Sequence, residues 1–147
     1  MERAELTKKI IAAKDERGLS WREIARKLNR APAFVTAALL GQMALAPAEA
    51  EKAGEMLGLS PAEARMLAQI PYRGAVDQMP PTDPLIYRFY EIVQVFGTTL
   101  KALIEEEFGD GIMSAIDFEM NVERVADPKG DRVRVTLNGK FLPYRKY

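Results

Sequence analysis

Arg88 and Glu91 form the residue pair of this chain that is best suited to binding or reacting with a small substrate. Both fall in a segment from Pro84 to Phe108 that we predict to be one helix, where positions three residues apart lie on neighbouring turns and their charged groups can meet. A guanidinium is a permanently charged donor fork that suits small planar anions. The carboxylate of Glu91 could orient that fork or pass a proton, and the sequence leaves both roles open.

The face of the predicted helix that carries the pair is expected to be covered. The pair lies off the apolar stripe that repeats at spacings of three and four, formed by Leu85, Phe89, Ile92, Val93, Phe96, Leu100, Leu103 and Ile104. Val95 and Ala102 share the side of Arg88 and Glu91, and a face turned to water has no need of a valine there. We therefore predict a buried, charged site, although from spacing alone a solvated pair worth ~0.2–0.5 kcal/mol is the commoner arrangement.

The composition excludes most catalytic chemistries. The chain has no Cys and no His, so it cannot form a thiolate nucleophile, a Ser-His-Asp relay, a Cys/His zinc site or a disulfide. The carboxylates at 105 to 107 are interpreted as a solvated helix end, and no metal or cofactor is predicted. No export signal or long apolar run is visible, so we expect a cytoplasmic protein with no membrane partner.

The first half of the chain has the helix-capping and helix-terminating residues that are typical of a helical bundle. Ser20 with Glu23 and Ser60 with Glu63 have the spacing of capping boxes, and Gly or Asn residues follow the apolar periods as stops. The predicted helices span roughly 2–17, 21–28, 32–40, 47–57 and 61–69. A linker rich in Pro follows at 71–84, which predicts two domains, a helical bundle at 1–75 and a dimerisation and catalytic domain at 76–147.

The second half changes from helical to strand periodicity. Asp83 and Pro84 cap the long helix, and the alternation from Ile116 to Glu123 predicts a strand. A second strand follows at 132–137, and Asn138-Gly139 signals a tight turn before a short third strand. The predicted class is α+β with a small antiparallel sheet. Two or three strands and one helix bury too little surface alone, so we expect another subunit to complete an intertwined dimer.

The predicted helices at 21–28 and 32–40 look like the phage-repressor-like helix-turn-helix, which raises a DNA-binding regulator as the alternative function. A recognition helix must present polar side chains to base edges, whereas Thr36 is the only polar side chain between Pro32 and Leu40. The formal net charge is zero, which is not a nucleic-acid footprint. We therefore expect no nucleic-acid partner and interpret the apolar helix as a contact surface.

Three long segments, which together with their surroundings span nearly the whole chain, resemble one known family. They are YRFYEIVQVFGTTLKALIEEEFGDGIMSAIDF at 87–118, VADPKGDRVRVTLNGKFLP at 125–143 and GQMALAPAEAEKAGEMLGLS at 41–60, and the family is cyanase, the bicarbonate-dependent cyanate hydratase or cyanate lyase. The resemblance implies a helical bundle joined to a domain that exchanges strands in a dimer. It further implies a homodecamer built from dimers, with active sites where dimers meet.

The same resemblance implies a catalytic trio, which falls here on Arg88, Glu91 and Ser114. It implies that bicarbonate adds to cyanate, that carbamate forms, and that ammonia and carbon dioxide are released without a cofactor, for cyanate detoxification or nitrogen supply. Ser114 lies just past Gly-Asp-Gly at the start of the first strand, where its hydroxyl can donate a hydrogen bond to a bound oxygen. No His exists to activate it, so we interpret it as a donor rather than a nucleophile, with activation by a distant Lys left open.

Overall fold

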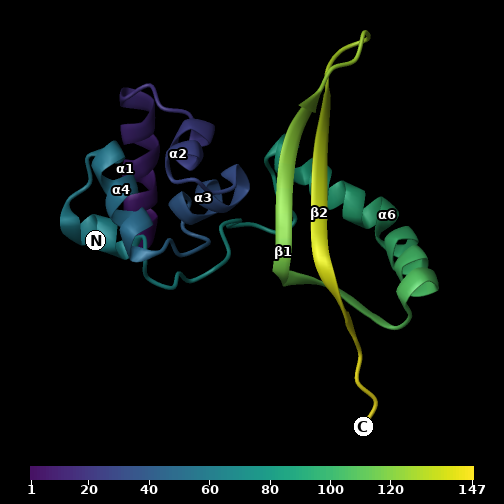
Figure 1. Cartoon of the computed structure of the whole chain (residues 1–147). Coiled ribbons are helices and arrows are strands. Elements are labelled where there is room, and N and C mark those ends of the chain that lie inside the picture. The colour runs from purple at the N-terminus through teal and green to yellow at the C-terminus, as the bar shows by residue number, and fades with distance from the viewer. The chain divides into compact units, whose positions relative to one another are not determined.

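The computed structural model describes all 147 residues and confirms the α+β class. Six helices precede a two-stranded antiparallel sheet formed by the last two elements. Figure 1 shows these two strands side by side. The chain divides into two compact units. One contains Met1–Ala75 with Asn121–Val135, and the other contains Val76–Met120 with Thr136–Tyr147. The candidate residues at 88, 91 and 114 all belong to the second unit.

The five short helices of the first unit begin where the capping signals predict. Ser20 and Ser60 accept hydrogen bonds from the backbone N–H of Glu23 and Glu63, and the carboxylate of each glutamate accepts one from the backbone N–H of its serine. The helix that begins at Pro61 ends three residues earlier than the sequence predicts, because the N–H groups of residues 67 to 69 donate to carbonyls three residues back instead of four. The helices are α1 (Arg3–Glu16), α2 (Trp21–Lys27), α3 (Pro32–Leu39), α4 (Pro47–Leu57) and α5 (Pro61–Met66).

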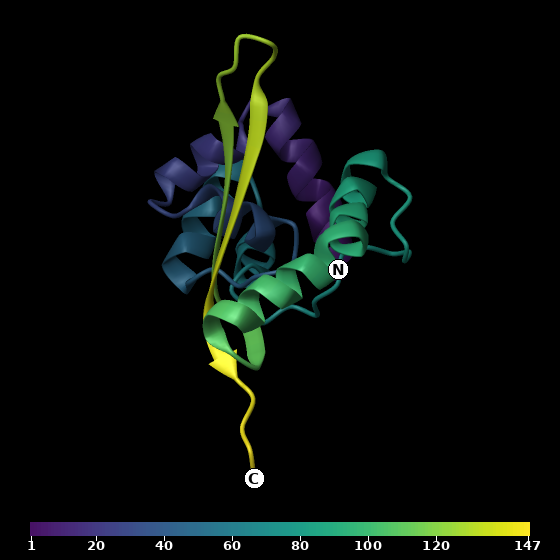
Figure 2. The same ribbon diagram turned by 90° about the vertical axis from the view of Figure 1, so that its right-hand side faces the viewer.

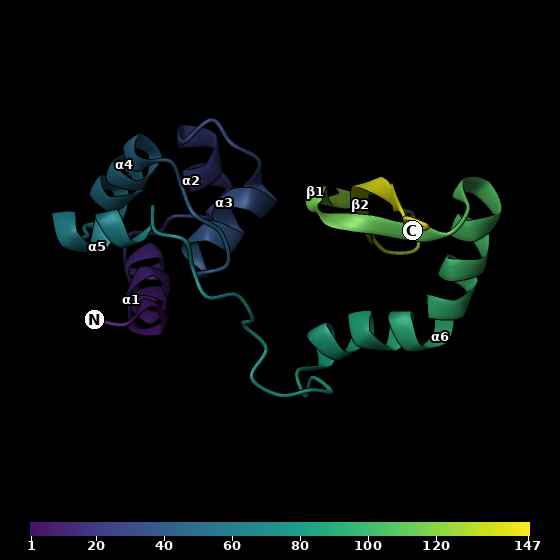
Figure 3. The ribbon, with the colours of Figure 1, turned by 90° about the horizontal axis from the view of Figure 1, so that it is seen from below.

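The hydrophobic core of the chain lies among these helices, which Figure 3 shows from below. Its largest fully buried side chains are Leu6, Ile10, Ile24, Val35, Leu39, Leu57 and Leu67. A charged side chain of α1 also contacts the end of α3. The Arg3 guanidinium donates to the carbonyl of Ala38 at 2.6 Å, so this carbonyl at the end of α3 accepts a second hydrogen bond besides that from the Gly41 N–H. The bundle therefore has the buried apolar surface of a self-contained domain.

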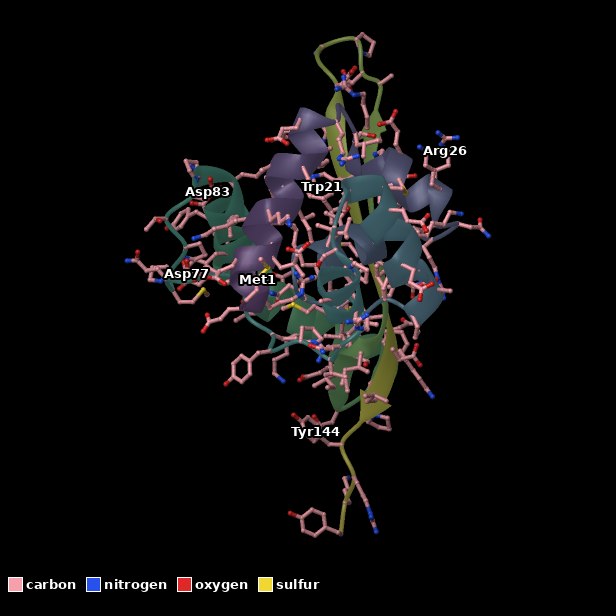
Figure 4. The ribbon with its side chains drawn as sticks, turned by 90° about the vertical axis from the view of Figure 1, so that its left-hand side faces the viewer. Met1, Trp21, Arg26, Asp77, Asp83 and Tyr144 are labelled. Carbon is pink, nitrogen blue, oxygen red and sulfur yellow. The ribbon has the colours of Figure 1, made fainter.

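The long helix α6 spans Pro84–Phe108, with the bounds that the sequence predicts. The Asp83 side chain accepts hydrogen bonds from the backbone N–H of Leu85 and Ile86, so its carboxylate caps the helix; Figure 4 labels this residue. The helix bends part-way along its length, as the two views in Figures 2 and 3 show. No helix of the chain is both long enough and apolar enough to cross a membrane.

The sheet is a long hairpin of β1 (Gly111–Val125) and β2 (Arg132–Pro143). Two details of the sequence prediction are wrong. The first strand begins five residues before Ile116, and Asn138-Gly139 does not form a turn, because β2 continues through it and takes in the predicted third strand. The Phe108 and Phe141 rings stack with centroids 5.1 Å apart, which joins the end of α6 to β2.

The chain from residue 76 onward has almost no core of its own. Only Pro81 and Ser114 are buried in this segment, and α6 has no buried residue at all. Along the predicted apolar stripe, Leu85 is 69% exposed and Leu103 is 60% exposed. A contiguous apolar helix face of this size is typical of an association surface rather than of a surface turned to water.

Candidate functional site

α6 places Arg88 and Glu91 side by side, as their spacing predicts. Arg88 Nη1 lies 3.9 Å from Glu91 Oε2, and the two side chains are 59% and 50% exposed. The predicted buried, charged site is therefore not present within a single chain. The physical reason is that the unit to which α6 belongs has too little surface of its own to bury any residue of this helix.

Two tyrosines lie near Arg88 on the same helix. The guanidinium carbon of Arg88 lies 5.5 Å from the centroid of the Tyr87 ring, which is within the range of a cation–π contact. The Tyr87 and Tyr90 rings are tilted to each other with centroids 5.9 Å apart. Gln94 donates to the Tyr90 hydroxyl at 3.1 Å. These contacts give the first turns of α6 a polar and aromatic surface beside Arg88.

Ser114 is the only buried polar residue in the second half of the chain, at 4% exposure. Its Oγ accepts hydrogen bonds from the backbone N–H of Ile116 at 3.0 Å and of Asp117 at 2.9 Å. Two donors occupy the two lone pairs of a hydroxyl, so its hydrogen is directed away from them. None of the chain's hydrogen bonds uses that hydrogen. The arrangement suits donation to a bound anion.

The strand opposite Ser114 approaches it unusually closely at Gly139. A Cβ at position 139 would overlap the carbonyl oxygen of Ser114 and would lie 2.6 Å from Cγ of Met113. The Asn-Gly pair predicts a turn at Gly139, and nothing in that prediction indicates this contact. The available signal was the alternation of Val133, Val135 and Leu137, which continues through Gly139 to Phe141 as one strand.

Of the three predicted site residues, the structure brings together only the two on α6. No hydrogen bond or ion pair joins Ser114 on β1 to Arg88 or Glu91. One chain therefore supplies a guanidinium with a neighbouring carboxylate at one place and a buried hydroxyl donor at another. Both groups are of the kind that binds a small anion.

The helices that look like a helix-turn-helix differ from a DNA reader in one respect. Thr36 remains the only polar side chain of α3, and it is half-buried together with Phe34 and Ala37. Of these two helices only α2 carries exposed cations, and Figure 4 shows the Arg26 side chain pointing away from the bundle. Phosphate contacts from α2 could not read sequence, because base edges are read by side chains of the recognition helix.

Comparisons with known families cover both halves of the chain. Residues 3–71 match the family model described as "Cyanate hydratase, N-terminal", and residues 78–146 match the "Cyanate lyase C-terminal domain". Among solved structures, the crystal structure of cyanase from T. urticae is similar with a TM-score of 0.83 at 40% sequence identity. The similarity covers 94% of this chain and 96% of that one.

Curated relatives are similar over the full length of both sequences. Cyanate hydratase of Variovorax paradoxus is 53% identical over 147 residues, and that of Ralstonia pickettii is 55% identical over 148, each with complete coverage of both chains. Identity at this level over the whole chain, with the same fold, leaves no segment outside the resemblance. The chain belongs to the cyanate hydratase (cyanate lyase) family and is a lyase.

Proposed function

We propose that this enzyme decomposes cyanate in a reaction that depends on bicarbonate and passes through carbamate, releasing ammonia and carbon dioxide. Membership of the family supports cyanate decomposition. The observation that carries the finer proposal is the Ser114 hydroxyl, which is buried, accepts two backbone N–H groups and retains its own hydrogen for a ligand. A donor of this kind binds an anionic oxygen and costs no reorganisation when the anion arrives.

Arg88 supplies the charge that the two substrates require. Cyanate and bicarbonate are both anions, so their approach is opposed by repulsion until a cation lies between or beside them. A guanidinium neutralises part of that charge and fixes small planar anions through parallel N–H groups. Positioning and electrostatic stabilisation then supply much of the rate enhancement, without a covalent intermediate on the protein.

The proposed chemistry balances without a cofactor. A bicarbonate oxygen bonds to the cyanate carbon, and the bicarbonate proton moves to nitrogen. The bond between that oxygen and the former bicarbonate carbon then breaks, so carbon dioxide leaves and the electron pair stays on the oxygen. One proton completes carbamate, and a second allows the C–N bond to break into ammonia and carbon dioxide. The sum consumes one cyanate, one bicarbonate and two protons.

Glu91 is the third member of the proposed site, and two roles fit its place. Its carboxylate lies near enough to Arg88 to attract the guanidinium and bias its direction. A carboxylate can also relay one of the two protons that the reaction consumes. The enzyme has no His to do so.

The proposed active site is assembled from more than one chain, in a decamer built from dimers. The exposed apolar stripe of α6 and the absence of a core beyond residue 76 support association through the second half of the chain. Within one chain, Ser114 makes no hydrogen bond to Arg88 or Glu91. This supports a site that combines residues of neighbouring subunits. The bundle at 1–75 takes an assembly role, and DNA is not a partner because α3 presents no base-reading side chains.

The test is an assay of ammonia released by the purified protein from cyanate. The buffer is freed of carbon dioxide, and bicarbonate is then added back. We expect release to rise with bicarbonate and to be negligible without it. Release that proceeds at the same rate in both buffers would reject the proposed mechanism while leaving cyanate decomposition itself intact.

A further inference from the structure

We propose that Gly139 is a positioning residue for the reaction, because its lack of a side chain lets β2 lie against Ser114 and fix the hydroxyl in place. The proposal rests on the proposed function of Ser114 as an anion donor. It assigns to Gly139 a role that acts through Ser114 rather than on the substrate itself.

The geometry at Gly139 leaves no room for a methyl group. A Cβ there would overlap the Ser114 carbonyl oxygen, would lie 2.6 Å from Met113 Cγ and would lie 3.3 Å from the Ser114 carbonyl carbon. Real Cβ atoms essentially never approach other heavy atoms below 3.0 Å. Two of the three contacts are with backbone atoms, which cannot rotate away, so any side chain at 139 must push the backbone of Ser114.

The requirement at this position is for space and not for an unusual backbone conformation. Gly139 is not among the residues with positive φ, so alanine could adopt its backbone angles without strain. The closest contacts of a methyl group at 139 would therefore be steric ones with residues 113 and 114. This distinguishes Gly139 from glycines such as Gly130, whose φ is +121° and whose surroundings are empty.

Displacement of Ser114 changes its hydroxyl direction as well as its position. The Oγ is held by the N–H groups of Ile116 and Asp117, two and three residues further along the same strand. A shift of the carbonyl at 114 moves the Cα that carries the side chain, while the two donors further along need not follow. A misplacement of ~1 Å in a positioned group can cost ~10²-fold in rate, so a contact of this kind matters to catalysis.

Gly111 provides a matched control on the same pair of strands. A Cβ at 111 would overlap the carbonyl oxygen of Leu142 and would lie 2.5 Å from Cζ of Phe141, so alanine there disturbs the hairpin to a similar degree. Its φ is also not positive. The Gly111 contact does not involve Ser114. Gly111→Ala therefore reports the cost of straining the sheet without moving the hydroxyl directly.

The experiment is a double-mutant cycle on the full-length protein. Wild type, Gly139→Ala, Ser114→Ala, the double variant and Gly111→Ala are compared for assembly state and for kcat and KM towards cyanate and bicarbonate. We expect Gly139→Ala to lower kcat/KM ~10- to 100-fold, approaching the loss in Ser114→Ala, with the assembly state retained. Because Gly139 acts through Ser114, its substitution should add nothing further in the Ser114→Ala background.

Two outcomes would overturn the inference: losses of kcat/KM from Gly139→Ala and Ser114→Ala that add in the double variant, or a loss in Gly111→Ala equal to that in Gly139→Ala. Either would mean that Gly139 only supports the structure of the sheet. If Gly139→Ala does not assemble, Met113→Ala is added to remove the side-chain part of the clash, and the same cycle is run against Met113→Ala. If Gly139→Ala fails to assemble both alone and in combination with Met113→Ala, the inference is also overturned. If Ser114→Ala retains wild-type kinetics, the proposed function fails. If Ser114→Ala is impaired and Gly139→Ala is not, only this inference fails.

Discussion

Arg88 Nη1 and Glu91 Oε2 lie 3.9 Å apart on neighbouring turns of α6. That distance is too long for an N–H···O hydrogen bond, whose heavy atoms lie at about 2.7–3.2 Å. The carboxylate therefore attracts the guanidinium without occupying its donors. Both side chains are at least half exposed, so the donor fork remains available to a ligand or to a neighbouring subunit.

Arg88→Lys is expected to lower kcat/KM for cyanate by at least ~10²-fold, because an ammonium keeps the charge but loses the planar pair of donors. Steady-state ammonia release at saturating bicarbonate measures the effect. Arg65→Lys is the matched control, since Arg65 is exposed on α5 and belongs to no ion pair. Activity of Arg88→Lys within a few-fold of the control would show that bidentate anion binding by this residue is not needed.

Ser114→Ala is expected to lower kcat/KM ~10- to 100-fold, the size of one lost hydrogen bond to a charged group, and to leave measurable bicarbonate-dependent activity. A nucleophile would behave differently, because its removal abolishes the covalent route altogether. The assay needs enough enzyme to detect ~10⁻⁴ of the wild-type rate. Residual activity below that level would contradict the role of Ser114 as a hydrogen-bond donor.

Leu100→Glu is expected to disrupt assembly, because Leu100 lies in the apolar stripe of α6 and is 50% exposed in the single chain. Burying one leucine contributes about 1.5–3 kcal/mol, and a two-fold interface counts each substitution twice, so subunit affinity should fall by at least ~10². Sedimentation velocity at micromolar concentration measures the assembly state. Ile11→Glu on α1, at a residue 38% exposed, introduces the same charge outside the second half of the chain. Identical sedimentation of wild type and Leu100→Glu would place the interface elsewhere.

The ion pair between Glu63 and Lys9 should make the stability of the helical bundle depend on pH. Lys9 donates to both carboxylate oxygens of Glu63, at 2.7 and 2.9 Å, and the Ser60 N–H donates at 2.8 Å. The pKa of Glu63 is lowered below its ordinary value of 4.5, mainly by the hydrogen bonds from Lys9 and to a smaller extent by the one from the Ser60 N–H. The stabilisation is therefore fully present above that ordinary value and is lost as the pH falls through the lowered folded-state pKa.

Thermal unfolding of wild type and Glu63→Gln between pH 7 and pH 3 measures this contribution. The gap in Tm between them should be widest near neutral pH and should narrow below about pH 4.5. Glu55→Gln, at an exposed position on α4, is the control and should keep a constant gap. A constant gap for Glu63→Gln as well would mean that the ion pair between α1 and α5 contributes no proton-linked stability.

The sequence predicts the elements whose signals are local. α6 has its predicted bounds because Asp83 and Pro84 start it and Gly109 follows its end. The Asn138-Gly139 turn was wrong for a physical reason. Asn-Gly favours a tight turn locally, but here the glycine is needed for the approach of β2 to Ser114, a contact that depends on residues some 25 positions away.

The candidate site was only partly predictable for the same reason. The i,i+3 spacing predicts that Arg88 and Glu91 meet, and they do. Their predicted burial depends on surfaces outside the chain and is not met within it. Ser114 is predicted as a site residue only by the family resemblance, because nothing in the local sequence distinguishes it from a residue at the start of a strand. Its two N–H donors become visible only when the backbone at 114–117 is known.

The proposed active site encloses a small anion between Arg88 and Ser114 of neighbouring protomers. A crystal structure of the assembled protein soaked with bromide tests it most directly, because anomalous scattering locates the anion without ambiguity. We expect bromide at a contact between protomers, within hydrogen-bond reach of an Arg88 guanidinium and a Ser114 hydroxyl. An Arg88 side chain in open solvent, remote from every such contact, with no anion beside Ser114, would contradict it.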